Sequence, residues 1–252
     1  MSQRRGPKSR LDVLLVERGL AESRTRAQAL VMARLVEVDG VTIDKAGTTV
    51  GVDAQVVVRP SGPTYVSRGG EKLAGALVAF APHGLVVADA VAADFGASTG
   101  GFVDCLLQHG AARVHAIDVG HGLLHQRLRQ DPRVVMWERT NARYVTAKTL
   151  GESADLVVID ASFIGLSKLL PAARDVLREQ GQLVALIKPQ FEAGRRQVTQ
   201  GRGVIRDENL RMSVIGRMLE HIAHDGFTVL ADSACVIAGP KGNREHFVFA
   251  RK

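Results

Sequence analysis

Four ionisable side chains stand where the predicted secondary-structure elements of this 252-residue chain begin or end. Lys72 lies on the helix before the first strand of the main sheet. The other three stand at strand ends: Asp160 after the fourth, Lys188 after the fifth and Glu245 at the start of the last. Open α/β sheets place their ligands at such ends. Lysine can take a proton from a hydroxyl group if burial or a second cation lowers its pKa, and a carboxylate can orient it.

Each of the four residues also has a non-catalytic interpretation. Lys72 could be a solvated helix lysine, and Lys188 a charge at a strand end. Asp160 could cap the following helix, and Glu245 could pair with a neighbouring cation on an edge strand. Only their joint occurrence favours a catalytic set.

A second chemical signal is the segment of small residues between the first sheet strand and the next helix, D-F-G-A-S-T-G-G-F at 94–102. Small residues let the backbone approach a ligand, and a helix N-terminus offers unpaired N–H groups. The glycine spacing lacks the middle glycine of the G-x-G-x-x-G pattern that holds a pyrophosphate. S-adenosylmethionine has no phosphate, and its carboxylate and amine fit such a loop. The predicted cofactor contacts are Gly96, Ser98, Thr99, Gly100, Gly101 and Phe102.

Two further residues are predicted to bind the cofactor. Asp118 ends the second sheet strand, about where an acidic residue binds ribose hydroxyls, although it could instead cap the next helix. Asn141 follows the third strand and is predicted to reach the adenine. With the glycine loop and a closing hairpin, Asp118 favours S-adenosylmethionine over a nicotinamide cofactor.

The elements that must position these residues alternate along the chain. Strand-like apolar segments, each followed by a helix-compatible segment, lie near 91–95, 113–117, 133–137, 155–160 and 182–188. This alternation predicts a parallel sheet with helices on both faces. A long helix at 207–224 then leads to strands at 228–236 and 245–250, joined by a turn at 239–242. The predicted fold class is therefore α/β, a class I (Rossmann-like) seven-stranded methyltransferase sheet whose last strand is antiparallel.

Residues 10–60 read as a separate, small α+β unit. An apolar helical pattern ends at Gly19, and Ser23 is the predicted N-cap of a second helix. An Asp39-Gly40 turn between alternating apolar residues predicts a hairpin, and a last short strand follows. We therefore expect an N-terminal domain over 1–60, a linker over 61–66 and the larger domain over 67–252.

The charge of the chain favours a polyanionic partner. The formal net charge is +7, and residues 1–34 hold eight Lys or Arg against three acids. Basic clusters are often only solvated faces, but the order R-L-D, G-L, S-R, V-x-V-D-G and K over 10–59 resembles the S-four (alpha-L) RNA-binding domain. The residues predicted to bind RNA are Arg10, Ser23, Arg24, Arg26 and Lys45.

Six ordered motifs extend this resemblance to almost the whole chain. The segments S-R-G-G-E-K-L, D-F-G-A-S-T-G-G-F, E-R-T-N-A-R, D-A-S-F-I, K-P-Q-F-E and G-N-R-E-H-F resemble the TlyA family, which joins an S-four domain to an FtsJ-like ribose methyltransferase domain. The resemblance implies rRNA (cytidine-2′-O)-methyltransferase activity on ribosomal subunits. The large subunit is the favoured target, and the small subunit stays open.

The same resemblance implies roles for the four ionisable residues, a K-D-K-E tetrad. Lys188 would be the base, and Lys72 would lower its pKa and help hold the hydroxyl. Asp160 would orient Lys188 and touch the cofactor. Glu245 would position Lys72 or the substrate.

Several other classes of protein are disfavoured. The D/N-P-P-Y/F motif of base N-methyltransferases is absent after the fourth strand, and Cys105 and Cys235 are badly placed for carbon-5 methylation. No metal site is expected, because neither cysteine has a Cys or His at ligand spacing. The family also carries the name hemolysin A, but no apolar run is long enough to span a membrane. We expect a cytoplasmic protein, with a monomer favoured, and keep a non-catalytic assembly factor as the alternative.

Overall fold

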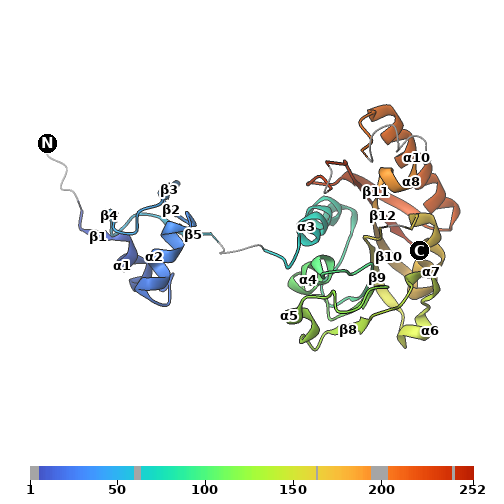
Figure 1. The fold of residues 1–252 in the computed structure, drawn as a ribbon, viewed down its shortest axis with the longest axis horizontal. Coiled ribbons are helices and arrows are strands. Elements are labelled where there is room, and N and C mark those ends of the chain that lie inside the picture. The colour runs from blue at the N-terminus through green and yellow to red at the C-terminus, as the bar shows by residue number, and fades with distance from the viewer. Residues whose placement is uncertain (1–5, 60–63, 163, 194–203, 240–241) are drawn as a thin grey trace. The chain divides into compact units, whose positions relative to one another are not determined.

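The computed structural model describes residues 6–59, 64–162, 164–193, 204–239 and 242–252. The chain divides into two compact units, Met1–Thr64 and Tyr65–Lys252 (Figure 1). Each unit has its own buried apolar core.

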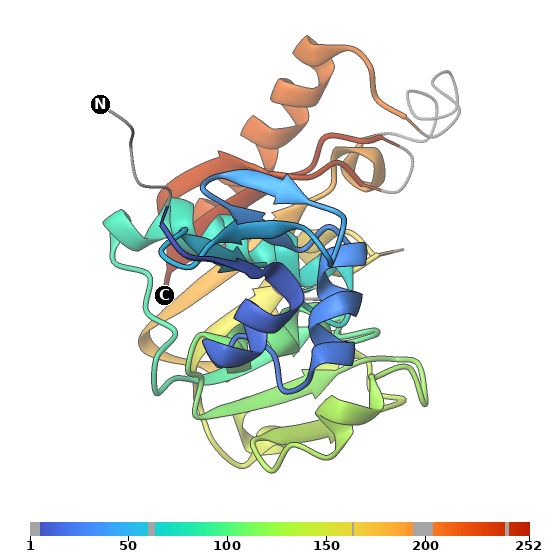
Figure 2. The same ribbon diagram turned by 90° about the vertical axis from the view of Figure 1, so that its left-hand side faces the viewer.

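The N-terminal unit consists of two helices on one face of small antiparallel sheets (Figures 1 and 2). Its elements are β1 (Lys8–Arg10), α1 (Leu11–Glu17), α2 (Arg24–Met32), β2 (Val36–Val38), β3 (Val41–Ile43), β4 (Thr49–Gly51) and β5 (Val56–Val58). One sheet has the order β3-β2-β5, and β1 pairs with β4. Leu11 and Leu15 of α1 pack against Val31 of α2 in the core beneath the strands.

Local signals in the N-terminal unit act as predicted. The hydroxyl of Ser23 accepts a hydrogen bond from the amide of Arg26 and so caps α2. Asp39 and Gly40 both have positive φ, as a tight hairpin turn requires, and they join β2 to β3. One element was not predicted: Lys8–Arg10, in the basic N-terminal segment, forms a strand paired with β4.

The C-terminal unit is a seven-stranded sheet with helices on both faces. Its strands are β6 (Val91–Phe95), β7 (Arg113–Ile117), β8 (Val134–Trp137), β9 (Ala154–Ile159), β10 (Leu177–Ile187), β11 (Thr228–Ala234) and β12 (His246–Arg251). Its helices are α3 (Arg68–Phe80), α4 (Gly101–Gln108), α5 (Gln126–Arg129), α6 (Ala147–Leu150), α7 (Leu170–Val176), α8 (Pro189–Glu192) and α10 (Glu208–His224). Short 3₁₀ turns are η1 (Ala81–His83), η2 (Ala142–Tyr144) and η3 (Leu166–Lys168).

The strand order confirms the predicted class I methyltransferase fold. The sheet runs β11-β12-β10-β9-β6-β7-β8. Strands β6 to β10 are parallel to their neighbours within that group, and β12 inserts antiparallel between β10 and β11. The sheet therefore reverses its strand order beside β6, the point where open α/β sheets bind ligands.

Successive residues of the central strands point to opposite faces of the sheet. Ala92 of β6 packs into the core under α3, α4 and α5, while Ala93 packs into the core under α6, α7 and α10 (Figure 1). Both faces are therefore covered, which explains why these strands read as continuous apolar runs rather than alternating ones.

Some boundaries differ from the prediction, and some predicted segments lie outside the described residues. Strand β10 begins at Leu177 rather than near 182, with irregular pairing to β9 between Leu177 and Gln182. Outside the described residues are part of the linker (61–63), residues 194–203 and the middle of the 239–242 turn. In the described parts, no helix has both the length and the apolar character needed to cross a membrane.

Candidate active site

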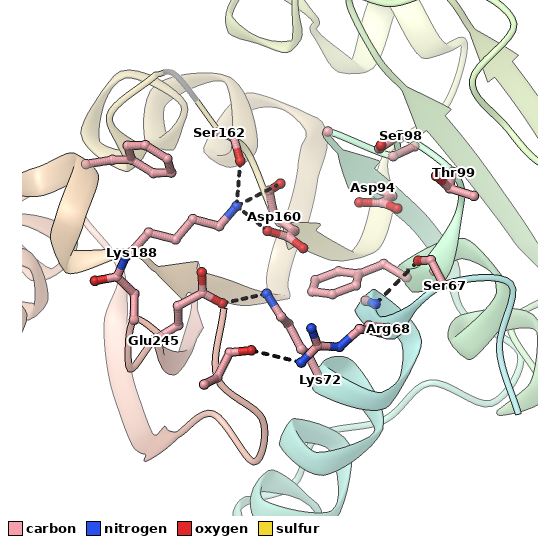
Figure 3. Close-up of a pocket in the computed structure, with 18 of the residues that line it drawn as sticks. Ser67, Arg68, Lys72, Asp94, Ser98, Thr99, Asp160, Ser162, Lys188 and Glu245 are labelled. Atoms are coloured by element: carbon pink, nitrogen blue, oxygen red, sulfur yellow. Dashed lines mark hydrogen bonds and ion pairs between the residues drawn. The ribbon is translucent and has the colours of Figure 1, made fainter. Parts of the chain in front are cut away.

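A pocket of about 750 Å³ opens at the carboxyl ends of β6, β9 and β10. Its wall includes all four residues of the predicted K-D-K-E set, which come from four separate segments of the chain (Figure 3). The glycine loop after β6 forms the opposite wall. The structure thus brings the four predicted catalytic residues and most of the predicted glycine-loop contacts together in one cavity.

One lysine–carboxylate pair joins α3 to the segment before β12. The Nζ atom of Lys72 lies 2.5 Å from Oε2 of Glu245, and the two residues are only 8% and 2% exposed. Ser67 caps α3 and accepts from the amide of Gly69, so the helix begins at Arg68 and turns Lys72 toward the sheet. Gln190 also donates from Nε2 to Oε1 of Glu245, at 3.3 Å. Both carboxylate oxygens of Glu245 are therefore engaged.

A second pair joins the ends of β9 and β10. These strands are parallel neighbours, with Ala185 opposite Ile159, so Asp160 and Lys188 emerge at the same edge. The Nζ atom of Lys188 lies 2.5 Å from Oδ1 of Asp160 and donates to Oγ of Ser162 at 2.9 Å (Figure 3). Lys188 is 7% exposed, so its Nζ atom has little access to bulk water.

The glycine loop takes conformations that require small residues. Gly96 has φ +94°, and a Cβ there would lie 3.1 Å from the carbonyl oxygen of Asp160. Gly100 has φ +98° and precedes the first turn of α4. Residues of the predicted set that line the pocket are Gly96, Ser98, Thr99, Gly101, Phe102 and Asp160. Gly100 shapes the turn without lining the pocket.

Asp94 is a pocket residue that the sequence interpretation did not assign to the site. It is fully buried, and neither carboxylate oxygen has a hydrogen-bond partner of good geometry in the described residues. Burial raises the pKa of Asp94 well above its ordinary value, and the nearby carboxylates of Asp160 and Asp118 raise it further. The backbone amide of Val103 offsets only part of that rise. The available signal was a lone acid inside the apolar strand V-A-A-D-F.

Besides Gly100, two further predicted cofactor contacts lie outside the large pocket. Asp118 accepts hydrogen bonds from the amides of Ser98 and Gly120, at 2.8 and 2.7 Å, and borders a separate crevice of about 10 Å³. Asn141 is exposed and accepts from the amide of Arg143, which caps η2. Asp118 therefore holds the glycine loop through the amide of Ser98, on the side away from the large pocket. Asn141 belongs to a surface turn.

Other polar residues of the pocket were not predicted individually. They are Ser67, Arg68, Ser162, Gln190 and Asn243. All of them fall inside the six motif segments, so the signal was present, but it did not separate pocket residues from their neighbours. Arg68 donates to the carbonyl of Ala238 at 3.1 Å, which ties the start of α3 to the segment after β11.

Comparison with known proteins identifies the family. The FtsJ-like methyltransferase model matches residues 65–252, and the S4 domain model matches residues 9–56. A 16S/23S rRNA (cytidine-2′-O)-methyltransferase TlyA from Mycobacterium tuberculosis is 44% identical over 97% of this chain and 90% of its own length. The chain belongs to the TlyA family of FtsJ-like methyltransferases.

Other relatives of this TlyA-family chain carry a different name. Hemolysin A of Brachyspira hyodysenteriae is 41% identical over 95% of this chain and 99% of its own length. A solved structure described as a hemolysin from Streptococcus thermophilus is 40% identical, with a TM-score of 0.72 over 98% of this chain and 89% of that one. The family assignment and the methyltransferase fold are thus confirmed from sequence and structure alike.

In the N-terminal unit of this TlyA-family chain, the predicted RNA-binding residues lie at the end of β1, at the start of α2 and on one loop. Arg10 and Arg24 both contact the carboxylate of Asp12. The side chains of Arg26 and Lys45 are exposed. Ser23 uses its hydroxyl oxygen to cap α2. The structure therefore groups Arg10 with Arg24 and gives Ser23 a structural task as well.

Proposed function

We propose that this methyltransferase transfers a methyl group from S-adenosylmethionine to the ribose 2′-hydroxyl of a cytidine in ribosomal RNA. The observation that carries the proposal is the pair of buried lysine–carboxylate contacts, Lys72 with Glu245 and Lys188 with Asp160, on the wall of one pocket. Ribose hydroxyls are weak nucleophiles, so a site that methylates them must hold the oxygen and take its proton.

The carboxylates beside the glycine loop fit S-adenosylmethionine better than a dinucleotide. Among the described residues, the two buried carboxylate oxygens of Asp94 have no hydrogen-bond partner of good geometry, and Asp160 lies in the same pocket. Carboxylates attract the ammonium and sulfonium charges of S-adenosylmethionine and repel a pyrophosphate. When bound, this cofactor supplies an electrophilic methyl group. Asp94 and the loop Gly96–Phe102 would hold it, while contacts from Asp118 to ribose and from Asn141 to adenine stay predictions.

The two lysines are assigned different tasks. Lys188 accepts the proton of the 2′-hydroxyl at Nζ, and Asp160 together with Ser162 fixes the position of that atom. Lys72 holds the hydroxyl oxygen through its ammonium group, and Glu245 fixes Lys72 in turn. Because both lysines are nearly inaccessible to water, bulk solvent does not compete for the hydroxyl.

The choice of ribosomal RNA rests on the relatives and on the N-terminal unit. A relative 44% identical is named for cytidine-2′-O methylation of 16S and 23S rRNA, and the S4 match covers residues 9–56, which include Arg10, Arg24, Arg26 and Lys45. We favour large-subunit rRNA as the target, and small-subunit rRNA is the alternative target. A cytoplasmic monomer with a linker at 61–66 completes the proposal.

The test is methyl transfer to purified ribosomal subunits from radiolabelled S-adenosylmethionine, followed by mass spectrometry of the modified nucleotides. Lys188→Ala should lower kcat by about 10²–10⁴-fold, the usual contribution of a positioned base. Lys168→Ala is the matched control, since Lys168 is exposed and does not line the pocket; it should act like the wild type. Label on a base would refute the mechanism. Subunit binding without any label would favour a non-catalytic assembly factor.

A further inference from the structure

Asp12 is a fully buried carboxylate in a unit that otherwise has an apolar core. Oδ1 accepts from Nε of Arg10 and Oδ2 accepts from Nη2 of Arg10, both at 3.0 Å, a two-pronged contact. Oδ2 also accepts from Nε of Arg24 and from Nε2 of Gln28, both at 3.0 Å. Such a carboxylate is stable only because it is fully paired, and these four bonds hold the pKa of Asp12 well below its usual range.

The two arginine partners of Asp12 are exposed to solvent, whereas Asp12 itself is buried. The side chains of Arg10 and Arg24 are 49% and 56% exposed, while Asp12 is 0% exposed. In the described part of the chain, no hydrogen bond is made by Nη1 of Arg10 or by either Nη atom of Arg24. The buried carboxylate of Asp12 thus holds each guanidinium, and each guanidinium still presents N–H donors to solvent. Planar recognition of phosphate needs this arrangement.

The backbone of Asp12 reaches a third predicted RNA contact. Its amide donates to the carbonyl of Ala46 at 3.2 Å, directly beside Lys45. The neighbouring Leu11 amide donates to the carbonyl of Thr48 at 2.8 Å, which fixes the other side of the same loop. Asp12 therefore contacts both arginines and the loop that carries the lysine.

We infer that Asp12 is a positioning residue for RNA, which fixes Arg10 and Arg24 in the geometry that meets two backbone phosphates. The inference rests on the proposed function, since it assumes that the N-terminal unit binds ribosomal RNA. An arginine side chain that rotates freely on a surface loses conformational entropy when it binds RNA. An arginine that Asp12 already holds in place has lost that entropy before binding. The carboxylate thus improves affinity although it carries the wrong charge for an RNA-binding surface.

The negative charge of Asp12 allows a test that separates positioning from simple electrostatic attraction. Asp12→Asn and Glu22→Gln each remove one negative charge from the same unit, and Glu22 is exposed with no ion pair among the described residues. If charge alone decides binding, both variants hold ribosomal subunits more tightly than the wild type. If Asp12 positions the arginines, Asp12→Asn binds about tenfold more weakly, as expected for the loss of a charge-assisted contact, while Glu22→Gln binds equally or more tightly.

Salt dependence and kinetics supply readouts that a merely structural role would not move. The slope of log K against log salt should fall by about one to two for Asp12→Asn, because one or two phosphate contacts are lost. The KM for subunits should rise while kcat stays unchanged, since the catalytic pocket belongs to the other unit. Unchanged KM and salt slope in a folded Asp12→Asn variant would overturn the inference.

A second variant keeps the test decisive if Asp12→Asn disturbs folding. Arg10→Lys retains the charge at a half-exposed site but cannot make the two-pronged contact. It should weaken binding to subunits about tenfold although the charge is unchanged, because the two-pronged contact with Asp12 is lost. Wild-type affinity in a folded Arg10→Lys variant would refute the inference. Filter binding to subunits measures this without methyl transfer, so failure of the proposed reaction in the wild type is seen separately.

Discussion

The Nζ atom of Lys72 lies 2.5 Å from Oε2 of Glu245, although the two residues are 173 positions apart in the chain. The contact joins α3, which precedes the sheet, to the segment before its last strand. Both side chains are buried. Removal of either partner leaves a buried charge without compensation, which is costly in a protein interior.

Glu245→Ala should therefore lower both stability and activity. We expect a loss of about 3–5 kcal/mol in the free energy of unfolding, the usual cost of leaving one buried ion unpaired. Urea unfolding can be followed by the fluorescence of Trp137, the only tryptophan, which lies in the C-terminal unit. The double change Lys72→Met with Glu245→Leu should recover most of the stability, because it removes both charges, but none of the methyl transfer.

An exposed ion pair of the same unit is the control for that prediction. Glu179 is 86% exposed and lies 3.4 Å from Nζ of Lys252. Glu179→Ala should change the free energy of unfolding by about 0–1 kcal/mol and leave methyl transfer intact. Recovery of activity in the Lys72→Met, Glu245→Leu variant would show that the pair is structural rather than catalytic.

The residues at strand ends could be predicted because sheet topology dictates where they meet. Once strands 155–160 and 182–188 were recognised as parallel, Asp160 and Lys188 had to share an edge. The placement of Lys72 is different. A helix lysine has no periodic signal that separates a buried position from an exposed one, so only its motif indicated a role.

Contacts that depend on side-chain packing could not be predicted. Asp94 reads as part of an apolar strand, and its unpartnered carboxylate becomes visible only when the surrounding atoms are placed. Asn141 shows a different difficulty: its side chain caps a local turn, and the sequence alone does not distinguish that role from a ligand contact. Strand β1 was missed because its three residues pair with a distant segment and have no apolar pattern.

Asp94→Asn should stabilise the protein and weaken cofactor binding. The folded pKa of Asp94 is raised by burial, so the folded state keeps a proton that the unfolded state has already lost. Wild-type stability therefore falls as pH rises from the ordinary carboxyl value, about 3.9, toward the raised folded value, and levels off above it. The Asn variant lacks this loss. Its Tm at neutral pH should exceed the wild type by roughly 2–4 °C, which corresponds to about 1 kcal/mol.

Asp94→Asn should raise stability but weaken the binding of S-adenosylmethionine, and this loss of binding would be the functional role of Asp94. Calorimetric titration with S-adenosylmethionine should give a Kd at least tenfold higher for Asp94→Asn, because a charge-assisted contact to the cofactor amine is lost. Asp89→Asn is the control, since Asp89 is exposed and does not line the large pocket. Unchanged affinity for Asp94→Asn would remove Asp94 from the cofactor site.

Gly101→Ala should destabilise the contact between α3 and α4. A Cβ at Gly101 would lie 2.3 Å from Oγ of Ser67 and 2.7 Å from the amide of Gly70, so the start of α3 would have to move. We expect a loss of about 1–3 kcal/mol, as for other overpacked sites, and a lower kcat because Lys72 moves with the helix. Gly216→Ala in α10 is the control: nothing lies within 4 Å, so it should stabilise by about 0.4–1 kcal/mol. Equal unfolding curves for both variants would contradict the packing argument.

Cys105 should be chemically inert. It is fully buried on α4, and burial raises the pKa of its thiol to about 12, so the thiolate is scarce at neutral pH. Iodoacetamide at pH 8 should leave Cys105 unmodified in the native protein and label it after unfolding, as peptide mass spectrometry would show. Cys105→Ala should keep wild-type methyl transfer, because proton removal at a ribose hydroxyl needs no thiolate, whereas carbon-5 methylation of a pyrimidine does. A folded Cys105→Ala variant without activity would contradict the lysine mechanism and reopen covalent catalysis.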